Sequence, residues 1–101
     1  MSINNVTLIG HCGRDPEIRF FESGSSVAEF SVALNNPPKD GQPQDPDWVE
    51  VKAWGKTAQV AADYLRKGHR VGIVGRLKQE RWTDRTDASA RSKLVVIAER
   101  L

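Results

Sequence analysis

The sequence predicts an all-β fold, a five-stranded barrel with one helix between its third and fourth strands. Apolar and polar residues alternate with a period of two in five segments, which is typical of strands that bury one face. The period changes to three and four over residues 57–67, as in an amphipathic helix. The chain has 101 residues, 39% of them hydrophobic, so we expect one core and one domain over residues 1–101.

The first two strands are expected to form a hairpin. Residues 4–13 alternate until Arg14-Asp15-Pro16 breaks the pattern, because proline lacks a donor for the ladder. Residues 17–22 are predicted to continue this strand across a bend, and Ser23-Gly24-Ser25-Ser26 supplies a turn. Residues 27–34 form the second strand, whose core side holds Ala28, Phe30, Val32 and Leu34.

The third strand, residues 47–56, carries aromatic residues on its outer face. Val49, Val51 and Ala53 share one side, and the other side holds Trp48, Glu50, Lys52 and Trp54. Tryptophans beside lysines combine π-surface with positive charge, which suits stacked bases and their phosphates. The alternative is that a partner subunit, a covering loop or a second sheet buries the tryptophans. The preceding residues 35–46 hold four of the five prolines and are expected to be a mobile loop near this face.

The helix is predicted over residues 57–67, where the apolar positions are Ala58, Ala61, Ala62 and Leu65. Gly68 is expected to cap its end.

The fourth and fifth strands complete the prediction. Residues 70–78 alternate with Val71, Ile73, Gly75 and Leu77 toward the core. The opposite face carries Arg70, Gly72, Val74, Arg76 and Lys78, and the same parity reaches Trp82. Residues 83–92 are expected to be a hairpin loop, and residues 93–101 the last strand.

Five strands with a helix in this place match the order of an OB-fold, a partly open Greek-key barrel that commonly binds single strands or oligosaccharides. The charge distribution favours a polyanion. Residues 1–65 have 5 Lys and Arg against 9 Asp and Glu, whereas residues 66–101 have 10 against 4. Such a basic segment is either a solvated face or a binding site for nucleic acid, and Trp82 within it favours the binding site.

We expect no enzyme, because no catalytic constellation is present. His11 and His69 are far apart in sequence, and the neighbours His11 and Cys12 point to opposite faces of a strand. Hence no metal site and no cofactor are expected, and Asp45 and Asp47 are interpreted as solubilising residues. No apolar run approaches the roughly 20 residues of a membrane span, so we expect a soluble, intracellular protein.

Several motifs resemble one family along nearly the whole chain and in the right order. They are Asn5-Val6-Thr7-Leu8-Ile9-Gly10, Asp15-Pro16-Glu17-Ile18-Arg19, the strand from Trp48 to Lys56, Tyr64-Leu65-Arg66-Lys67-Gly68, and Gly75-Arg76-Leu77 with Trp82-Thr83-Asp84. Together they look like bacterial-type single-stranded DNA-binding proteins.

This resemblance implies an OB-fold that assembles as a homo-oligomer, usually a tetramer, and binds single-stranded DNA with little sequence preference in replication, recombination and repair. It therefore implies a cytoplasmic location at the nucleoid. By likeness, Trp48, Trp54 and Trp82 take the base-stacking positions. Phosphate contacts are implied for Lys56, Lys67, Lys78 and Arg81, whereas Lys52 and Arg76 are candidates from alternation alone.

The sequence departs from the family pattern at four places. Asn36-Pro37-Pro38 stands where a further stacking tryptophan is frequent, so one stacking platform is expected to be absent. Asp87 and Arg91 replace a glycine and an aromatic in the last loop, which is therefore expected to hold DNA by charge. Arg70 and Gly72 lie on a face that in the family packs one dimer against another. The sequence also ends at Leu101, without the family's acidic tail.

These departures leave alternatives open. Burying an unpaired Arg70 would be costly, so a dimer competes with the tetramer, which remains the favoured assembly. A dimeric adaptor of the primosomal type, which binds single strands and replication proteins, would also have this length and no tail. RNA is a third possibility, because stacking does not distinguish the two sugars.

Overall fold

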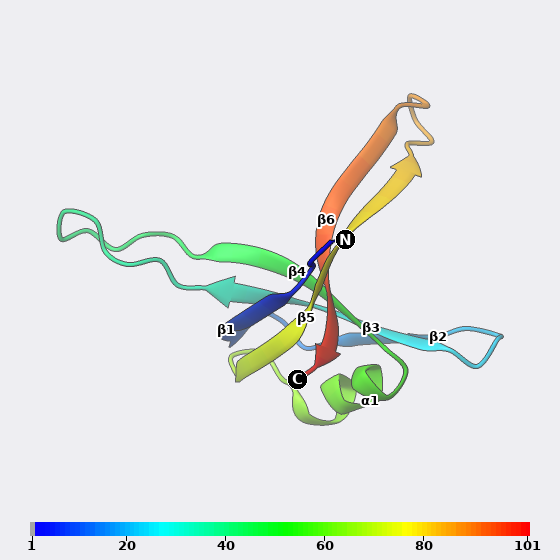
Figure 1. Ribbon diagram of the computed structural model, residues 1–101, viewed down its shortest axis with the longest axis horizontal. Coiled ribbons are helices and arrows are strands. Elements are labelled where there is room, and N and C mark those ends of the chain that lie inside the picture. Colours follow the sequence, from blue (N-terminus) through cyan, green and yellow to red (C-terminus); the bar gives the residue numbers. More distant parts are fainter. Residues whose placement is uncertain (1) are drawn as a thin grey trace.

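The computed structural model describes residues 2–101, which fold into a small barrel with projecting arms (Figure 1). In chain order, the elements are β1 (Val6–Cys12), β2 (Glu17–Phe20), β3 (Ser26–Leu34), β4 (Asp47–Trp54), α1 (Gly55–Tyr64), β5 (Arg70–Thr83) and β6 (Ala90–Arg100). The helix thus follows β4 and precedes β5.

Five of these strands close a ring, which confirms the predicted OB-fold class. Their order is β1-β5-β6-β4-β3, and a short pairing of β1 with β3 at His11↔Ala33 and Cys12↔Val32 joins the ends. All of these contacts are antiparallel except the one between β4 and β6, which is parallel at Val51↔Val96. β2 lies outside the ring and extends the sheet by pairing with β3.

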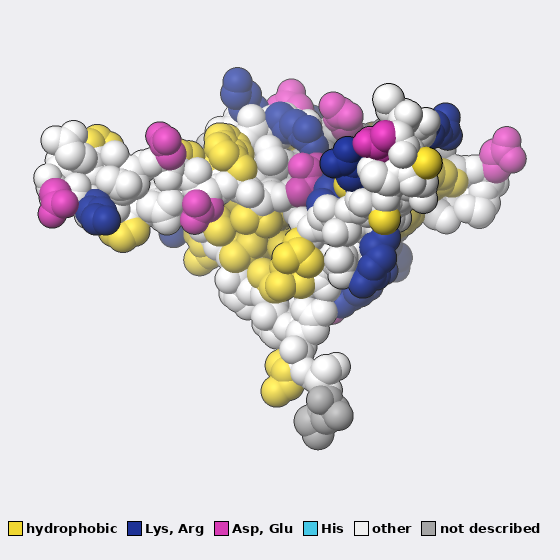
Figure 2. Space-filling model, turned by 90° about the horizontal axis from the view of Figure 1, so that it is seen from above, with side chains coloured by type: hydrophobic (Ala, Val, Ile, Leu, Met, Phe, Trp, Pro, Cys, Tyr) yellow, Lys and Arg dark blue, Asp and Glu magenta, His cyan; other side chains and the backbone are white. Residues whose placement is uncertain are grey.

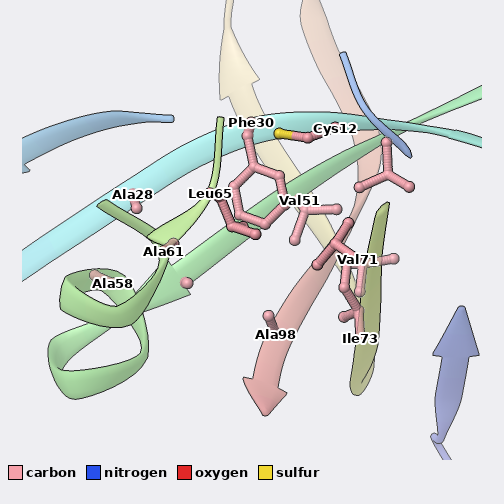
Figure 3. Close-up of a cluster of buried hydrophobic side chains, with 13 residues drawn as sticks. Cys12, Ala28, Phe30, Val51, Ala58, Ala61, Leu65, Val71, Ile73 and Ala98 are labelled. Carbon is pink, nitrogen blue, oxygen red and sulfur yellow. The ribbon is translucent and has the colours of Figure 1, made fainter. Parts of the chain in front are cut away.

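The core is built from the inner faces of the ring strands (Figure 3). Phe30 is its largest fully buried side chain, with Val51 and Ile73 also inside. Ala58, Ala61 and Leu65 of the helical segment join the same cluster, and α1 packs on β3 and β4. Small helix residues let α1 approach the sheet closely, so the helix and the ring strands share one core.

The predicted helix bounds, residues 57–67, were wrong at both ends, since α1 begins at Gly55 and ends at Tyr64. Leu65 is the C-cap in an extended conformation, and its N–H donates to the carbonyl of Ala61 at 3.0 Å. The following turn is bound to the end of β1, because the Gly68 N–H donates to the Cys12 carbonyl at 2.7 Å. These contacts turn the chain away before Gly68, which has φ +88° but does not cap the helix.

Leu77, predicted to face the core, is 44% exposed. Its backbone lies beyond the end of β1, where the pairing of β1 with β5 stops at Val6↔Gly75. The side chain of Asn4 instead makes two hydrogen bonds with the backbone of Leu77. The Asn4 Nδ2 donates to the Leu77 carbonyl, and the Leu77 N–H donates to Asn4 Oδ1, both at 2.8 Å. The alternation therefore predicted the strand correctly, but the prediction that Leu77 faces the core was wrong, because the barrel ends before this residue.

β5 and β6 continue as one arm well beyond the ring. Thr83 and Ala90 still pair, so the predicted loop 83–92 reduces to a tight turn over residues 84–89. The second arm is the segment between β3 and β4, which folds back on itself through reciprocal hydrogen bonds between Lys39 and Gln42. Asp40 and Gly41, at its tip, both have positive φ, as a two-residue hairpin turn requires.

Candidate nucleic-acid interface

The outer surface of β4, β6 and β5 is one continuous face, which we call the aromatic face. The strand register places even-numbered residues of β4 and β5 beside odd-numbered residues of β6 on this face. Its members are Trp48, Glu50, Lys52 and Trp54 of β4; Arg91, Lys93, Val95, Ile97 and Glu99 of β6; and Arg76, Lys78, Glu80 and Trp82 of β5. Val95 and Ile97 are buried beneath their neighbours on this face. All three tryptophans of the chain therefore share one surface.

The tryptophans are open to solvent within the chain. Trp48 is 61% exposed, and Trp54 and Trp82 are each 46% exposed. The possibility that a loop or a second sheet of the described chain covers them is therefore wrong. Figure 2 shows hydrophobic side chains gathered at the surface beside a mixture of Lys, Arg, Asp and Glu. Hydrophobic surface and both signs of charge are thus displayed together in this view.

A different neighbour positions each ring. Trp48 lies directly over Gly13: a Cβ added there would be only 2.4 Å from Cζ3 of the indole. Trp54 is stacked on Phe21, with 5.9 Å between ring centroids and 18° between the planes. Trp82 lies on the β5–β6 arm opposite Arg91, beside an open hollow of about 440 Å³. The sequence had not identified Gly13 or Phe21 as part of this surface.

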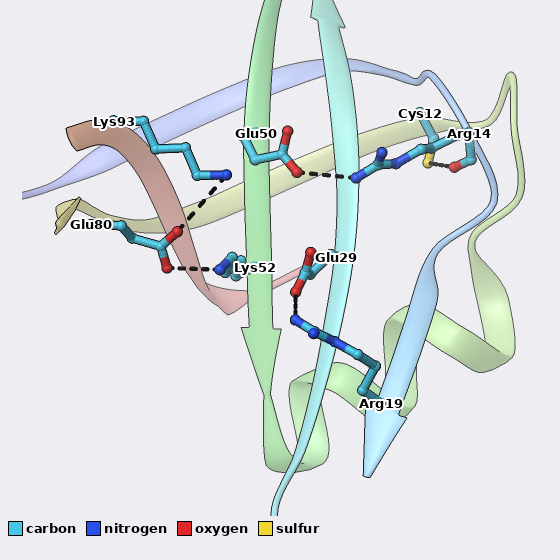
Figure 4. A network of polar contacts seen from close by, with 8 residues as sticks. All are labelled: Cys12, Arg14, Arg19, Glu29, Glu50, Lys52, Glu80 and Lys93. Carbon is cyan, nitrogen blue, oxygen red and sulfur yellow. Dashed lines mark hydrogen bonds and ion pairs between the residues drawn. The ribbon is translucent and has the colours of Figure 1, made fainter. Parts of the chain in front are cut away.

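The basic residues predicted from alternation, Lys52 and Arg76, lie on the aromatic face but are paired with carboxylates. Figure 4 shows the pair made by Lys52. Lys52 Nζ is 2.7 Å from Glu80 Oε2, and its side chain is only 15% exposed. Arg76 Nε is 3.9 Å from a carboxylate oxygen of Glu99. Arg14, from the bend after β1, also reaches this side of the sheet and binds Glu50 at 3.0 Å.

The four residues implied by resemblance occupy different places. Lys78 is exposed on the aromatic face and has no salt bridge among residues 2–101. Lys56 is exposed in the first turn of α1, two residues after Trp54. Lys67 lies in the turn between α1 and β5, where its backbone N–H donates to Asp15. Arg81 is on the opposite side of the arm, hydrogen-bonded to Gln79 at 2.6 Å, although it borders the hollow at Trp82.

Salt bridges between residues of the tip stabilise the end of the β5–β6 arm. Arg91 Nη2 lies 3.3 Å from Asp87, and Arg91 Nε lies 3.7 Å from Asp84. The N–H and hydroxyl of Ser89 donate to Asp87, and these bonds lower the pKa of the Asp87 carboxyl. The Arg91 charge expected to hold DNA is therefore already engaged by two carboxylates.

Other chemistry finds little support in the described residues. Cys12 is buried and its thiol donates to the Arg14 carbonyl at 2.9 Å; burial raises the pKa of this thiol, which disfavours the nucleophilic thiolate. No group of three His, Cys, Asp or Glu side chains is placed to hold a metal ion in residues 2–101. Within the same range, no helix has the length and apolar character to cross a membrane.

A five-stranded OB barrel that displays tryptophans and cations on one open face defines a nucleic-acid-binding domain. The comparison with protein families agrees: residues 3–101 match the model of the single-strand binding protein family. The chain belongs to this family.

Curated relatives match this chain over nearly all of its residues. A single-stranded DNA-binding protein of Thermosynechococcus vestitus is 50% identical over 101 residues, covering 100% of this chain and 82% of the relative. Single-stranded DNA-binding protein 1 of Synechocystis is 45% identical over 97 residues, covering 95% and 78%. Single-stranded DNA-binding protein 1 of Nostoc is 44% identical over 101 residues, covering 100% and 82%. The chain thus has the single-stranded DNA-binding function of its family, which is not enzymatic.

Proposed function

We propose that the aromatic face holds single-stranded DNA by stacking bases on Trp48, Trp54 and Trp82, while nearby cations bind the phosphates. The observation that carries this proposal is the position of three half-exposed tryptophans on one continuous surface. Every base has a π-face, so stacking tolerates any sequence. The chain would then act as one DNA-binding domain at the nucleoid, protecting single strands in replication, recombination and repair.

The basic side chains differ in how readily they can contact the phosphates of the DNA. Lys78 is exposed on the aromatic face and Lys56 is exposed two residues after Trp54, so they are the first candidates for phosphate contacts. Lys52 and Arg76 must first leave their carboxylates. Lys67 and Arg81 lie off the aromatic face and would contact a strand that leaves it around the helix or the arm.

Phe21 extends the stacking surface at Trp54. Its ring is nearly parallel to the indole and 43% exposed, so a base could rest on the pair as a larger platform. This platform is supplied by the turn after β2. It adds aromatic area at the turn after β2, whereas the missing aromatic at Asn36 would have stood where the arm between β3 and β4 begins.

The test is a tryptophan fluorescence titration with an oligothymidine, repeated over a salt series and with oligouridine. We expect quenching on binding and a log affinity that falls with log salt by about 0.7 for each phosphate neutralised. Trp54→Ala and Trp82→Ala should each remove part of the quenching and each weaken binding by roughly 1 to 3 kcal/mol. Unchanged affinity in both variants would show that the DNA uses another surface, and equal affinity for oligouridine would extend the ligand to RNA.

For the assembly, we propose a homotetramer over the dimeric adaptor. The outer side of β1 and β5 displays Ile9, which is 62% exposed, next to Gly72, an apolar surface suited to another subunit. Arg70 lies at the rim of this surface, where β5 begins and pairs with His11, so it can stay hydrated when the surface is covered. Light scattering should give a mass of four chains, and a mass of two would favour the adaptor.

A further inference from the structure

Glu80 occupies the middle of the aromatic face and binds two lysines there (Figure 4). Its Oε2 accepts a hydrogen bond from Lys52 Nζ at 2.7 Å, and its Oε1 lies 4.0 Å from Lys93 Nζ. Lys93 is directly opposite Glu80 on the neighbouring strand. Lys52 comes from β4, so its side chain passes over β6 to reach Glu80.

Lys52 and Glu80 are both less exposed to solvent than Lys93. The exposed fractions are 15% for Lys52 and 25% for Glu80, whereas Lys93 is 48% exposed. Charges in such a half-buried site are screened less by salt than charges in open water. Both ammonium groups are on the same side of the sheet as the tryptophans, where a bound strand would place its phosphates.

We propose that Glu80 is an intramolecular competitor of the DNA backbone and limits affinity at the centre of the aromatic face. A phosphate that binds Lys52 or Lys93 must displace the carboxylate and lie near its negative charge. This inference rests on the proposed use of the aromatic face for DNA, and it identifies the residue that tunes binding there. Lys78 provides a contrast, because it shares the face without a salt bridge in the described chain.

The competition has a thermodynamic signature. A phosphate that meets a free lysine releases salt ions, which makes the affinity depend on salt. A phosphate that replaces Glu80 releases a carboxylate that stays attached to the protein, so fewer ions are exchanged. Glu80 should therefore weaken binding and also flatten its salt dependence.

The experiment compares Glu80→Gln with the natural sequence by oligothymidine titration across a salt series. Glutamine keeps the shape and can still accept a hydrogen bond from Lys52, so the fold should persist, and a thermal melt checks this. We expect affinity to rise by roughly fivefold near 0.1 M salt, on the scale of a partly screened charge pair. We also expect the salt slope to steepen by about 0.7 for each lysine released.

Asp63→Asn is the matched control. It makes the same change of net charge on the exposed side of α1, where Asp63 accepts a hydrogen bond from Gln59 instead of binding a cation. We expect a smaller gain and an unchanged slope. An equal response of the two variants would show that only net charge matters and would overturn the proposal.

Lys93→Gln provides a second measurement, made at the more exposed of the two lysines that Glu80 binds. In the natural sequence it should cost little affinity, because Lys93 is occupied by Glu80. In the Glu80→Gln background it should cost clearly more. Equal losses in both backgrounds, or a Glu80→Gln variant that folds but binds no better, would refute the competition. If the tryptophan variants keep full affinity, the aromatic face itself is not the binding surface, which is a separate failure.

Discussion

The two faces of β4 contrast in almost every physical property. The inner face holds Val51 and Ala53, which are fully buried against the core. The outer face holds two tryptophans that stay open to solvent and a lysine bound to a carboxylate of another strand. A core needs only small apolar side chains that fill space, so the aromatics outside it contribute little that the barrel requires. The difference separates residues that make the fold from residues available for binding.

The largest effect should come from the inner face. Phe30→Ala removes the largest fully buried side chain and leaves a cavity that the surrounding strands cannot fill. We expect the free energy of unfolding to fall by about 3 to 5 kcal/mol, measured by urea denaturation. DNA binding should be lost only to the extent that the protein unfolds. A strong loss of affinity in a fully folded variant would show that the two faces are not separable.

A smaller effect should come from the boundary between the two faces. Gly13→Ala places a methyl group 2.4 Å from the Trp48 ring, which is exposed and can swing outward. We expect Trp48 to be displaced, with a loss of affinity no greater than one stacked base, about 1 to 3 kcal/mol. Fluorescence of a Trp54→Phe, Trp82→Phe background reports Trp48 alone. Unchanged emission and quenching would show that Gly13 does not position this ring.

The smallest expected effect on stability concerns Cys12, which is buried in the core. Its pKa is raised above the ordinary 9.0 by burial, so the folded state favours the neutral thiol. Stability from this group is complete below pH 9 and decreases as pH rises, because the unfolded chain loses its proton first. Urea midpoints should therefore fall slightly above pH 9, and Cys12→Ala should remove this decline. Rapid labelling of the folded thiol near neutral pH would contradict the burial.

The sequence predicted the barrel because alternation at Val49, Val51 and Ala53 and the alanine spacing of the helix are local signals of burial. The sequence-based prediction was wrong where the structure depends on contacts between residues far apart in the chain. The turn after α1 depends on the hydrogen bonds of Cys12 with Gly68 and His69, and the exposure of Leu77 depends on where β1 stops. The turn at Asp40-Gly41 was visible in the sequence, since this dipeptide is a strong hairpin signal, but the prolines favoured a loop.

The candidate site, like the fold, was predicted where local patterns determine it and missed where distant contacts determine it. Parity alone places Trp48, Trp54 and Trp82 outward, and the structure brings them onto one face. Pairing of charges was not predictable, because Lys52 and Glu80 are 28 residues apart and meet only through the order of strands. Phe21 could have been noticed as an aromatic next to a turn, but its contact with Trp54 required the sheet register.

The most direct test of the separation between the faces is to measure unfolding and DNA binding on one preparation of the Trp54→Ala, Trp82→Ala double variant. We predict a free energy of unfolding within about 1 kcal/mol of the natural sequence, since both rings are half exposed. Binding of oligothymidine should weaken by about 1 to 3 kcal/mol for each base that loses its stack. Full affinity in a folded double variant, or loss of the fold with the rings, would contradict the assignment.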